Sequence, residues 1–334
     1  MICPKPLKPG ACVGLIAPSS PVTPDERIRC VRSLESLGFS VKTGQSLCRD
    51  DNLFGYLAGR AEDRAKDINC MFADSEVEAV FCVRGGYGSS QILPFLDYDC
   101  IRRNPKVFVG YSDVTGIHTV LQRFCGLVTF HGPMVRPNLG GAVGADSSSL
   151  AGADSEVLSG AVDYTLQSLY TACGGEKSWV FENPAGEDFW SVAPGRAEGF
   201  LTGGNLSVLA RSLGTPYAPH TWGKIVFLED IGESIPRIHM YLTQMLYAGV
   251  FRGVQGILLG NFTDCSGGLR SVQELLTEFT KNLGIPVIGN VCSDHRSPMG
   301  TLPLGGWCRM QAGEESVPQI EFSTCNISRP VIKW

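Results

Sequence analysis

The sequence of 334 residues lacks a long apolar run, a cluster of basic residues and any closely spaced pair of cysteines. A helix that spans a bilayer needs roughly 18 or more consecutive apolar residues, so no transmembrane segment is predicted. Binding to nucleic acid needs a basic footprint, and the net charge of −5 argues against a nucleic-acid partner. A helix lying on a membrane surface would be basic and amphipathic, and none is apparent.

The 13 cysteines are scattered between Cys3 and Cys325 and include no C-x-x-C pair. Zinc sites usually contain such pairs, so we expect no metal, and no cofactor motif is found either. The first residues, MICPKPLKPG, have no apolar segment after a basic start, which predicts a cytoplasmic protein without a secretory signal. In that compartment disulfides are rare, and the cysteines are interpreted as small buried hydrophobic residues.

The composition predicts two hydrophobic cores, because the chain is long and 43% of its residues are hydrophobic. In the first half, short apolar runs alternate with helical patterns, which predicts βαβ units and a largely parallel sheet. One helix start is explicit: Thr23 precedes Pro24, and Glu26 follows the threonine by three positions, as in a capping box. A stretch at 137–162 rich in Gly, Ser and Ala predicts a linker or surface segment, after which the α/β pattern resumes.

One apolar run, KVFVG, leads directly into Ser112, and a helix is predicted from about Val114 to Phe124. A serine on a sharp turn between strand and helix has the setting of a nucleophile elbow, with the helix N-terminus facing a developing oxyanion. The pattern departs from G-x-S-x-G because Val114 stands where the second glycine would be. A serine at this position is also typical of an ordinary helix cap.

A second predicted strand ends in the sequence RGGYG at 84–88. Glycines there allow backbone N–H groups to approach a ligand closely, which favours an anion cradle or an oxyanion hole. The turn is not a P-loop, because no G-K-[ST] follows it. A tight turn that requires positive φ would explain the same glycines.

A serine nucleophile needs a general base, and the sequence offers five histidines: His118, His131, His220, His239 and His295. His118 lies within the helix predicted after the serine and is not expected to fold back onto it. His131 follows a strand in the same half of the chain and is a competing candidate. His295 lies in a polar loop after a strand, where catalytic groups are commonly mounted. His220 lies in a loop flanked by proline, and His239 lies within a predicted helix and is interpreted as structural. The residues alone leave three candidates open: His131, His220 and His295.

The base must in turn be oriented by a third group, normally a carboxylate. Glu229 and Asp230 stand at the end of the predicted strand KIVFL. Either side chain could turn inward and accept a hydrogen bond from a histidine, or could be exposed and solvated.

Taken together, these segments resemble the LD-carboxypeptidase family, the murein tetrapeptide carboxypeptidases. The similar motifs occur in order along most of the chain: LIAPSSP, RGGYG, GYSD, HGPM, GRAEGFLTGGNLSVLARSLGTPY, FLEDIGE and the SDHRSPMGTLPLG loop. The resemblance implies an N-terminal α/β domain over 1–150 with a largely parallel sheet. It further implies a linker over 151–175 and a smaller, mixed and β-rich C-terminal domain over 176–334.

The resemblance also implies an activity: removal of the terminal D-alanine from murein tetrapeptides by a serine carboxypeptidase, during recycling of cell-wall peptides. Ser112 would be the nucleophile, His295 the general base and Glu229 the group that orients it. Family members are usually dimers, so a homodimer is expected.

The resemblance places the oxyanion hole at backbone N–H groups of Gly85, Gly86 and Asp113. Two neighbours are proposed to bind substrate from their position alone. Arg84 could pair with the free carboxylate of the peptide, although a structural ion pair is an equal alternative. Tyr87 lies in the same turn.

Two other functions compete with this interpretation. Microcin-immunity peptidases share the triad but cleave aminoacyl-nucleotide analogues, using a longer insertion whose aromatic residue stacks on the base. The corresponding stretch at 176–195 is short, although Trp179 and Trp190 could still stack. A non-catalytic binding module would use Gly85–Gly88 as an anion cradle and Ser112 as a helix cap.

Overall fold

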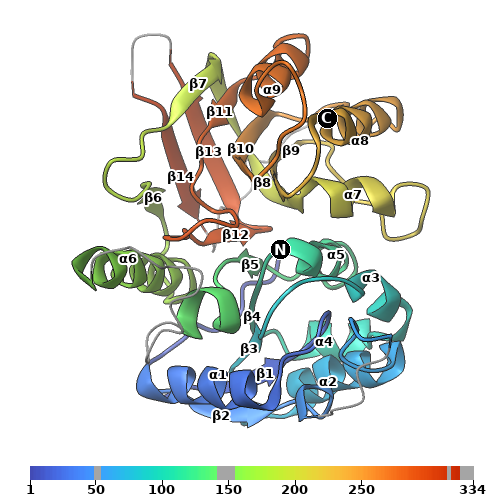
Figure 1. Cartoon of the computed structure of the whole chain (residues 1–334), viewed down its shortest axis with the longest axis vertical. Coiled ribbons are helices and arrows are strands. Elements are labelled where there is room, and N and C mark those ends of the chain that lie inside the picture. Colours follow the sequence, from blue (N-terminus) through green and yellow to red (C-terminus); the bar gives the residue numbers. More distant parts are fainter. Residues whose placement is uncertain (49–53, 141–154, 314–316, 324–334) are drawn as a thin grey trace, which may run out of the picture.

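The computed structural model describes residues 1–48, 54–140, 155–313 and 317–323, whose strands form two sheets (Figure 1). In spatial order, the first sheet contains β12 (Leu302–Leu304), β5 (Thr129–His131), β4 (Val107–Gly110), β3 (Ala79–Cys82), β1 (Cys12–Ile16) and β2 (Ser40–Thr43). Its neighbours pair in parallel except β12, which runs antiparallel to β5. The predicted largely parallel sheet is therefore confirmed.

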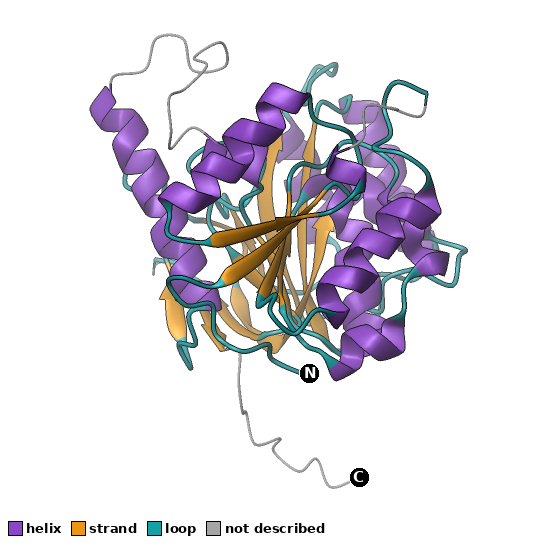
Figure 2. Cartoon of the chain, turned by 90° about the horizontal axis from the view of Figure 1, so that it is seen from below, coloured by secondary structure: helices purple, strands orange, loops and turns teal. Residues whose placement is uncertain are grey.

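Helices cover both faces of this first sheet, and Figure 2 shows helices on either side of the strands. One face packs against α1 (Pro24–Ser36) and α6 (Ser155–Cys173), and the other against α2 (Ala61–Ala73), α4 (Tyr98–Arg103) and α5 (Thr115–Val120). Shorter helical segments connect these elements: η1 (Ser46–Cys48), α3 (Ser89–Ile92), η2 (Leu93–Phe95) and η5 (Val135–Leu139). Within the described ranges no helix is long and apolar enough to cross a membrane.

The capping box of α1 is confirmed, since the Thr23 hydroxyl accepts from the Glu26 N–H and the Glu26 carboxylate accepts from the Thr23 N–H. The stretch at 137–162 is only partly observable, because 141–154 lie outside the described residues. Part of the predicted linker is helical, as α6 begins at Ser155.

The second sheet is mixed, as predicted for a β-rich second half. In spatial order it contains β6 (Trp179–Phe181), β14 (Gln319–Ser323), β13 (Trp307–Ala312), β8 (Gly195–Asn205), β9 (Lys224–Ile231), β10 (Gly256–Thr263), β11 (Val287–Gly289) and β7 (Trp190–Ala193). The pairs β8–β9, β9–β10 and β10–β11 are parallel and the others antiparallel. One face packs against α7 (Leu206–Ser212), α8 (Ile235–Tyr247) and α9 (Val272–Lys281).

Strand β12 connects the two halves of the molecule. It comes from the C-terminal half of the chain but pairs with the edge of the first sheet, Leu302 opposite His131 and Leu304 opposite Thr129 (Figure 1). The segment between β11 and β12 must therefore pass from the second sheet to the first. This path brings the loop that carries His295 toward the carboxyl end of β4, where Ser112 lies.

Candidate active site

Ser112 lies on a sharp turn where β4 ends. Its φ of 61° is in the left-handed region, and a 3-10 turn, η3 (Ser112–Val114), leads directly into α5. The predicted helix is thus divided into η3, α5 and a π-helical turn, η4 (Leu121–Cys125). Tyr111, not Ser112, is the N-cap residue of the turn. The geometry is that of a nucleophile elbow, and the helix-cap interpretation of Ser112 is wrong.

The left-handed backbone of Ser112 predicts a stability difference between two inactive variants. A residue with a Cβ in this region costs roughly 1 kcal/mol or more, and glycine avoids that cost. We expect Ser112→Gly to be more stable than Ser112→Ala by up to about 1 kcal/mol, after allowing for the greater entropy of glycine in the unfolded chain. Urea unfolding of the two proteins measures this difference, and a more stable alanine variant would show that the turn is not strained.

His295 and Glu229 form a buried pair beside this turn. The Glu229 Oε2 atom lies 2.8 Å from His295 Nδ1, and the side chains are 0% and 11% exposed respectively. The Tyr111 ring packs edge-on against the His295 ring, with centroids 4.9 Å apart. Because Tyr111 precedes Ser112, this contact places the histidine beside the predicted nucleophile. With Nδ1 held by the carboxylate, Nε2 is the ring nitrogen left for proton transfer.

Charge and burial act in opposite directions on this pair. Burial raises the pKa of Glu229, although attraction to His295 opposes the rise. Burial also disfavours the charged form of His295, but the charge and hydrogen bond of Glu229 outweigh it and raise the pKa of His295 above its usual value of 6.5. The carboxylate therefore stabilises the imidazolium, which is the charge that a general base acquires.

The competing histidine, His131, is not placed to act as a base. It is fully buried between the rings of Tyr111 and Phe227, at centroid distances of 5.9 and 5.1 Å. Burial holds the pKa of His131 well below its usual range. His118 is also fully buried, its ring nitrogens 2.8 Å from Thr129 Oγ1 and from the Gly110 carbonyl. Both are structural, and the exposed His220 and His239 have no comparable carboxylate contact within the described residues.

Glu229 and Asp230 have different partners because they point to opposite faces of a strand. β9 continues through both of them rather than ending before them as predicted. Glu229 faces His295, whereas Asp230 accepts hydrogen bonds from the Asn205 side chain and the Ser207 N–H, both at 2.9 Å. Asp230 thus fixes the start of α7, and Glu229 is the carboxylate that contacts the histidine.

The glycine turn that follows β3, RGGYG at 84–88, lies against Ser112. A Cβ atom added to Gly85 would stand 3.0 Å from Ser112 Cβ, 3.3 Å from its Oγ and 3.5 Å from the Asp113 nitrogen. Gly86 and Gly88 have φ of 119° and 111°, so the predicted positive-φ turn is also present. A Cβ on Gly86 would overlap the Ser20 hydroxyl. The absence of side chains therefore leaves space beside the Ser112 hydroxyl and the Asp113 N–H.

This close approach predicts that Gly85→Ala lowers activity more than stability. The backbone of Gly85 is not left-handed, so alanine fits it, but the new Cβ would displace Ser112. We expect kcat to fall by about tenfold or more, with little change in unfolding temperature. Gly268→Ala is the control, since its Cβ would stand 3.2 Å from Ile235, outside this site. Equal activity in both variants would contradict the close approach.

Side-chain contacts that the sequence analysis did not predict hold the glycine turn and the turn at Ser112 together. The Asp113 carboxylate accepts hydrogen bonds from the Ser19 hydroxyl at 2.7 Å and the Ser89 N–H at 2.8 Å, and is 7% exposed. Arg64, 1% exposed, donates to the carbonyls of Pro18 and Gly88. These bonds fix the ends of β1, β3 and β4 relative to one another. The serines of LIAPSSP could have been recognised in the sequence as polar residues at the end of a strand. Nothing in the sequence of the charged helix α2 indicates that Arg64 is buried.

The two residues proposed to bind substrate both border the turn. The Arg84 guanidinium is 3.5 Å from the Pro21 carbonyl, and burial lowers its pKa. Tyr87 is 47% exposed, and its N–H donates to the Ser20 hydroxyl. In the described parts of the chain, no group of three or more His, Cys, Asp or Glu side chains could hold a metal ion.

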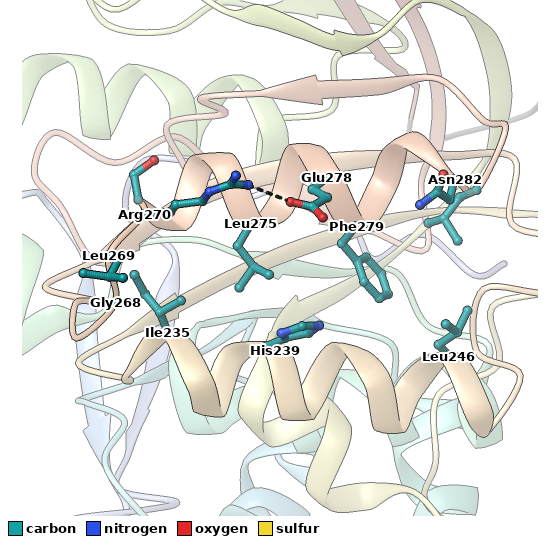
Figure 3. Close-up of a pocket in the computed structure, with 12 residues that line it drawn as sticks. Ile235, His239, Leu246, Gly268, Leu269, Arg270, Leu275, Glu278, Phe279 and Asn282 are labelled. Atoms are coloured by element: carbon teal, nitrogen blue, oxygen red, sulfur yellow. Dashed lines mark hydrogen bonds and ion pairs between the residues drawn. The ribbon is translucent and has the colours of Figure 1, made fainter.

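A separate groove lies between α8 and α9 and encloses about 660 Å³. Figure 3 shows Ile235, His239 and Leu246 from α8 on one side of the groove, across from Leu275 and Phe279 of α9. Arg270 and Glu278 form an ion pair of 3.0 Å at its rim. None of the predicted catalytic residues lines this groove.

The fold and this arrangement agree with the family comparisons. Residues 13–132 match the model of the LD-carboxypeptidase N-terminal domain, and residues 198–310 match that of the C-terminal domain. The chain therefore belongs to the LD-carboxypeptidase family, whose members are peptidases.

Particular relatives make the similarity more specific. A probable murein peptide carboxypeptidase of Bacillus subtilis is 37% identical over 94% of this chain and 92% of its own length. A murein tetrapeptide carboxypeptidase of Pseudomonas aeruginosa is 32% identical over 88% of this chain and 91% of its own. The structure of the microcin C7 self-immunity protein MccF in complex with aspartyl sulfamoyl adenosine superposes with a TM-score of 0.83. It is 26% identical and covers 97% of this chain and 98% of its own.

Proposed function

We propose that the chain is a serine carboxypeptidase that hydrolyses the amide bond to the terminal D-alanine of murein tetrapeptides. The observation that carries the proposal is the buried Glu229–His295 pair beside a left-handed serine, Ser112. The names of the relatives support the substrate class.

In the proposed mechanism, the Ser112 hydroxyl attacks the scissile carbonyl while His295 Nε2 takes its proton. Glu229 holds the imidazole through Nδ1 and stabilises the imidazolium. Backbone N–H groups of Gly85, Gly86 and Asp113 are proposed to bind the oxyanion. When the C–N bond breaks, His295 returns the proton to the D-alanine amine, leaving an ester on Ser112. Water then attacks the ester carbonyl while His295 takes its proton, and His295 returns that proton to Ser112 Oγ as the C–O bond breaks, which releases the shortened peptide and the free serine.

The direct test is the release of D-alanine from a murein tetrapeptide by the purified protein, compared with hydrolysis of aspartyl sulfamoyl adenosine. Preference for the tetrapeptide is expected. Both tryptophans considered for stacking on a base are packed in the second sheet, Trp179 against Phe322 at 5.8 Å and Trp190 over Gly289. This packing favours the peptide substrate. Turnover of the adenosine compound alone would overturn the proposal.

Arg84 is proposed to bind the free carboxylate of the substrate. We expect Arg84→Ala to raise KM for the tetrapeptide by about tenfold and to change kcat less, because a charge-assisted hydrogen bond contributes roughly 1.5–3 kcal/mol. Steady-state kinetics measure this, with Arg309→Ala in the second sheet as the control, since Arg309 is 59% exposed. An unchanged KM would assign Arg84 a structural role.

We also propose that the protein is a cytoplasmic homodimer, with domains over 1–150 and 176–334 and a linker over 151–175. Light scattering after size-exclusion chromatography measures the mass of the particle, and twice the chain mass is the expected result.

A further inference from the structure

A β-bulge interrupts strand β10 beside Glu229. Across a shift in its pairing with β9, strand β10 advances three residues, from Leu259 to Phe262, while β9 advances two. Gly260 and Asn261 therefore both lie opposite Glu229, and we call these two residues the β10 bulge. A bulge frees backbone groups from the ladder of the sheet, and bulges are common next to active sites, where they redirect a side chain.

The first residue of the β10 bulge lies against the carboxylate of the catalytic pair. A Cβ atom on Gly260 would stand 3.0 Å from Glu229 Cβ and 3.0 Å from the Phe227 ring. The φ of Gly260 is not in the left-handed region, so the backbone conformation does not require a glycine here. What the glycine provides is space beside the side chain of Glu229.

The second residue of the β10 bulge binds the loop that carries His295. The Asp294 carboxylate, 1% exposed, accepts hydrogen bonds from the Asn261 N–H at 3.3 Å and from the Asn261 side-chain amide at 3.0 Å. The same amide donates to the side chain of Asn290, the first residue after β11, at 3.1 Å. The other oxygen of Asp294 accepts from the Arg296 N–H at 2.9 Å and from Arg296 Nε at 3.3 Å. Both oxygens of this buried carboxylate are therefore held.

We propose that the β10 bulge positions the Glu229–His295 pair. Asn261 and Asp294 are the positioning residues, and neither is assigned a contact with the substrate. Gly260 leaves the place that the carboxylate of the pair occupies, and Asn261 fixes the histidine loop through Asp294. Both members of the pair are thus set by two adjacent residues of one strand. This inference rests on the proposed function, because it concerns the same site.

Asp294 also adds negative charge near the histidine. Burial lowers the pKa of His295, but the charge and hydrogen bond of Glu229 and then the charges of Asp230 and Asp294 raise it. The charged and titratable groups around the His295 ring come from the elements packed against it: Glu229 and Asp230 on β9, Tyr111 after β4, His131 on β5 and Asp294 in its own loop. The phenol and the second imidazole are neutral, because burial raises the pKa of the former and lowers that of the latter. Arg296 offsets part of the charge of Asp294.

The test compares D-alanine release from a murein tetrapeptide by the wild type, Asp294→Asn and Asn261→Ala over a range of pH. In both variants kcat is expected to fall by about tenfold and KM to change by less than about twofold, because a misplaced base slows the reaction without altering binding. In Asp294→Asn the acidic limb of kcat/KM should move to lower pH, whereas Asn261→Ala keeps the carboxylate and should keep the limb. The double variant should lose no more than Asp294→Asn alone, since both changes act through one contact.

Asp99→Asn is the matched control. It also removes a carboxylate from an ion pair with arginine, Asp99 with Arg102 at 2.7 Å, but the Asp99 side chain is 67% exposed. This variant should retain the kcat and the pH profile of the wild type.

NMR of the His295 ring in the substrate-free protein gives a readout that needs no turnover. Asp294→Asn should lower the pH at which the ring titrates, and Asn261→Ala should shift the Nδ1 proton signal, which reports on the hydrogen bond to Glu229. Unchanged kcat in both variants, or a loss of kcat with unchanged ring signals, would overturn the inference. If the wild type released no D-alanine, the proposed reaction would fail, and the ring signals alone would decide whether Asn261 and Asp294 position the pair.

Discussion

Ser112→Ala is expected to reduce release of D-alanine from a murein tetrapeptide by at least about 10⁴-fold. The hydroxyl supplies the attacking oxygen, and water cannot take its place with the same alignment to His295. The loss should appear in kcat, since the substrate-binding surface is unchanged. Quantifying free D-alanine with a coupled amino-acid oxidase assay, under single-turnover conditions, measures the effect.

Two controls separate this result from unfolding. Ser75→Ala changes an exposed serine in the turn before β3, at the amino ends of the parallel strands and therefore at the opposite end of the sheet from Ser112, and should retain full activity. Ser112→Ala itself should unfold at a temperature close to that of the wild type, because the side chain is only partly buried. Equal release of D-alanine by Ser112→Ala and the wild type would show that the nucleophile is another residue.

Glu229→Gln is expected to lower kcat by about 10³-fold or more and to move the pH dependence of the reaction. The amide cannot stabilise the imidazolium as a carboxylate does, and it can present its NH₂ to Nδ1 and so favour the wrong tautomer. In the wild type the pKa of His295 is raised above 6.5 by Glu229. Because only the neutral imidazole can accept a proton, kcat/KM should rise with pH through this raised value. In Glu229→Gln the acidic limb should move to lower pH.

The negative charge of Glu229 also makes the free energy of unfolding depend on pH, because it raises the pKa of His295 in the folded protein. A folded pKa above the unfolded value means that the folded chain binds the proton more tightly. The resulting stabilisation is present below about pH 6.5 and is lost as the pH rises through the folded pKa of His295. Urea unfolding at several pH values should show this loss in the wild type and not in Glu229→Gln. Glu198→Gln, at a carboxylate whose side chain is 56% exposed, is the control for both measurements. An acidic limb that does not move in Glu229→Gln would argue against the assigned role of this carboxylate.

The alternation of strands and helices in the first half was readable from sequence because each signal is local. The capping box at Thr23 and the buried strand before Ser112 depend on residues a few positions apart, and both were predicted correctly. The sequence predicted a sharp turn at Ser112 but not the positive φ of this residue. The family resemblance, rather than the spacing of single residues, selected His295 and Glu229.

What the residues alone left open depends on contacts between distant segments. The sequence predicted both His131 and His295 to follow strands. In the structure His131 is the last residue of β5 and is buried between Tyr111 and Phe227, whereas the chain that leads to β12 brings His295 beside Tyr111. In the sequence, Asp230 is recognisable only as an acidic residue near the end of a strand. The structure shows that its carboxylate accepts a hydrogen bond from the Ser207 N–H at the start of α7. The burial of Arg64 likewise depends on carbonyls of two other segments, Pro18 and Gly88, which no local pattern reveals.

The position of β12 has a consequence for how the chain is made. During synthesis, β5 leaves the ribosome about 170 residues before Leu302–Leu304, the strand that covers its free edge. Until then the nascent first sheet presents unpaired N–H and C=O groups, a known template for aggregation. The edge of β5 is covered and the His295 loop reaches Ser112 in the same step, because only a few residues separate His295 from β12. A ribosome stalled before residue 302 would therefore hold a protein that has its nucleophile but neither its base nor a closed sheet edge.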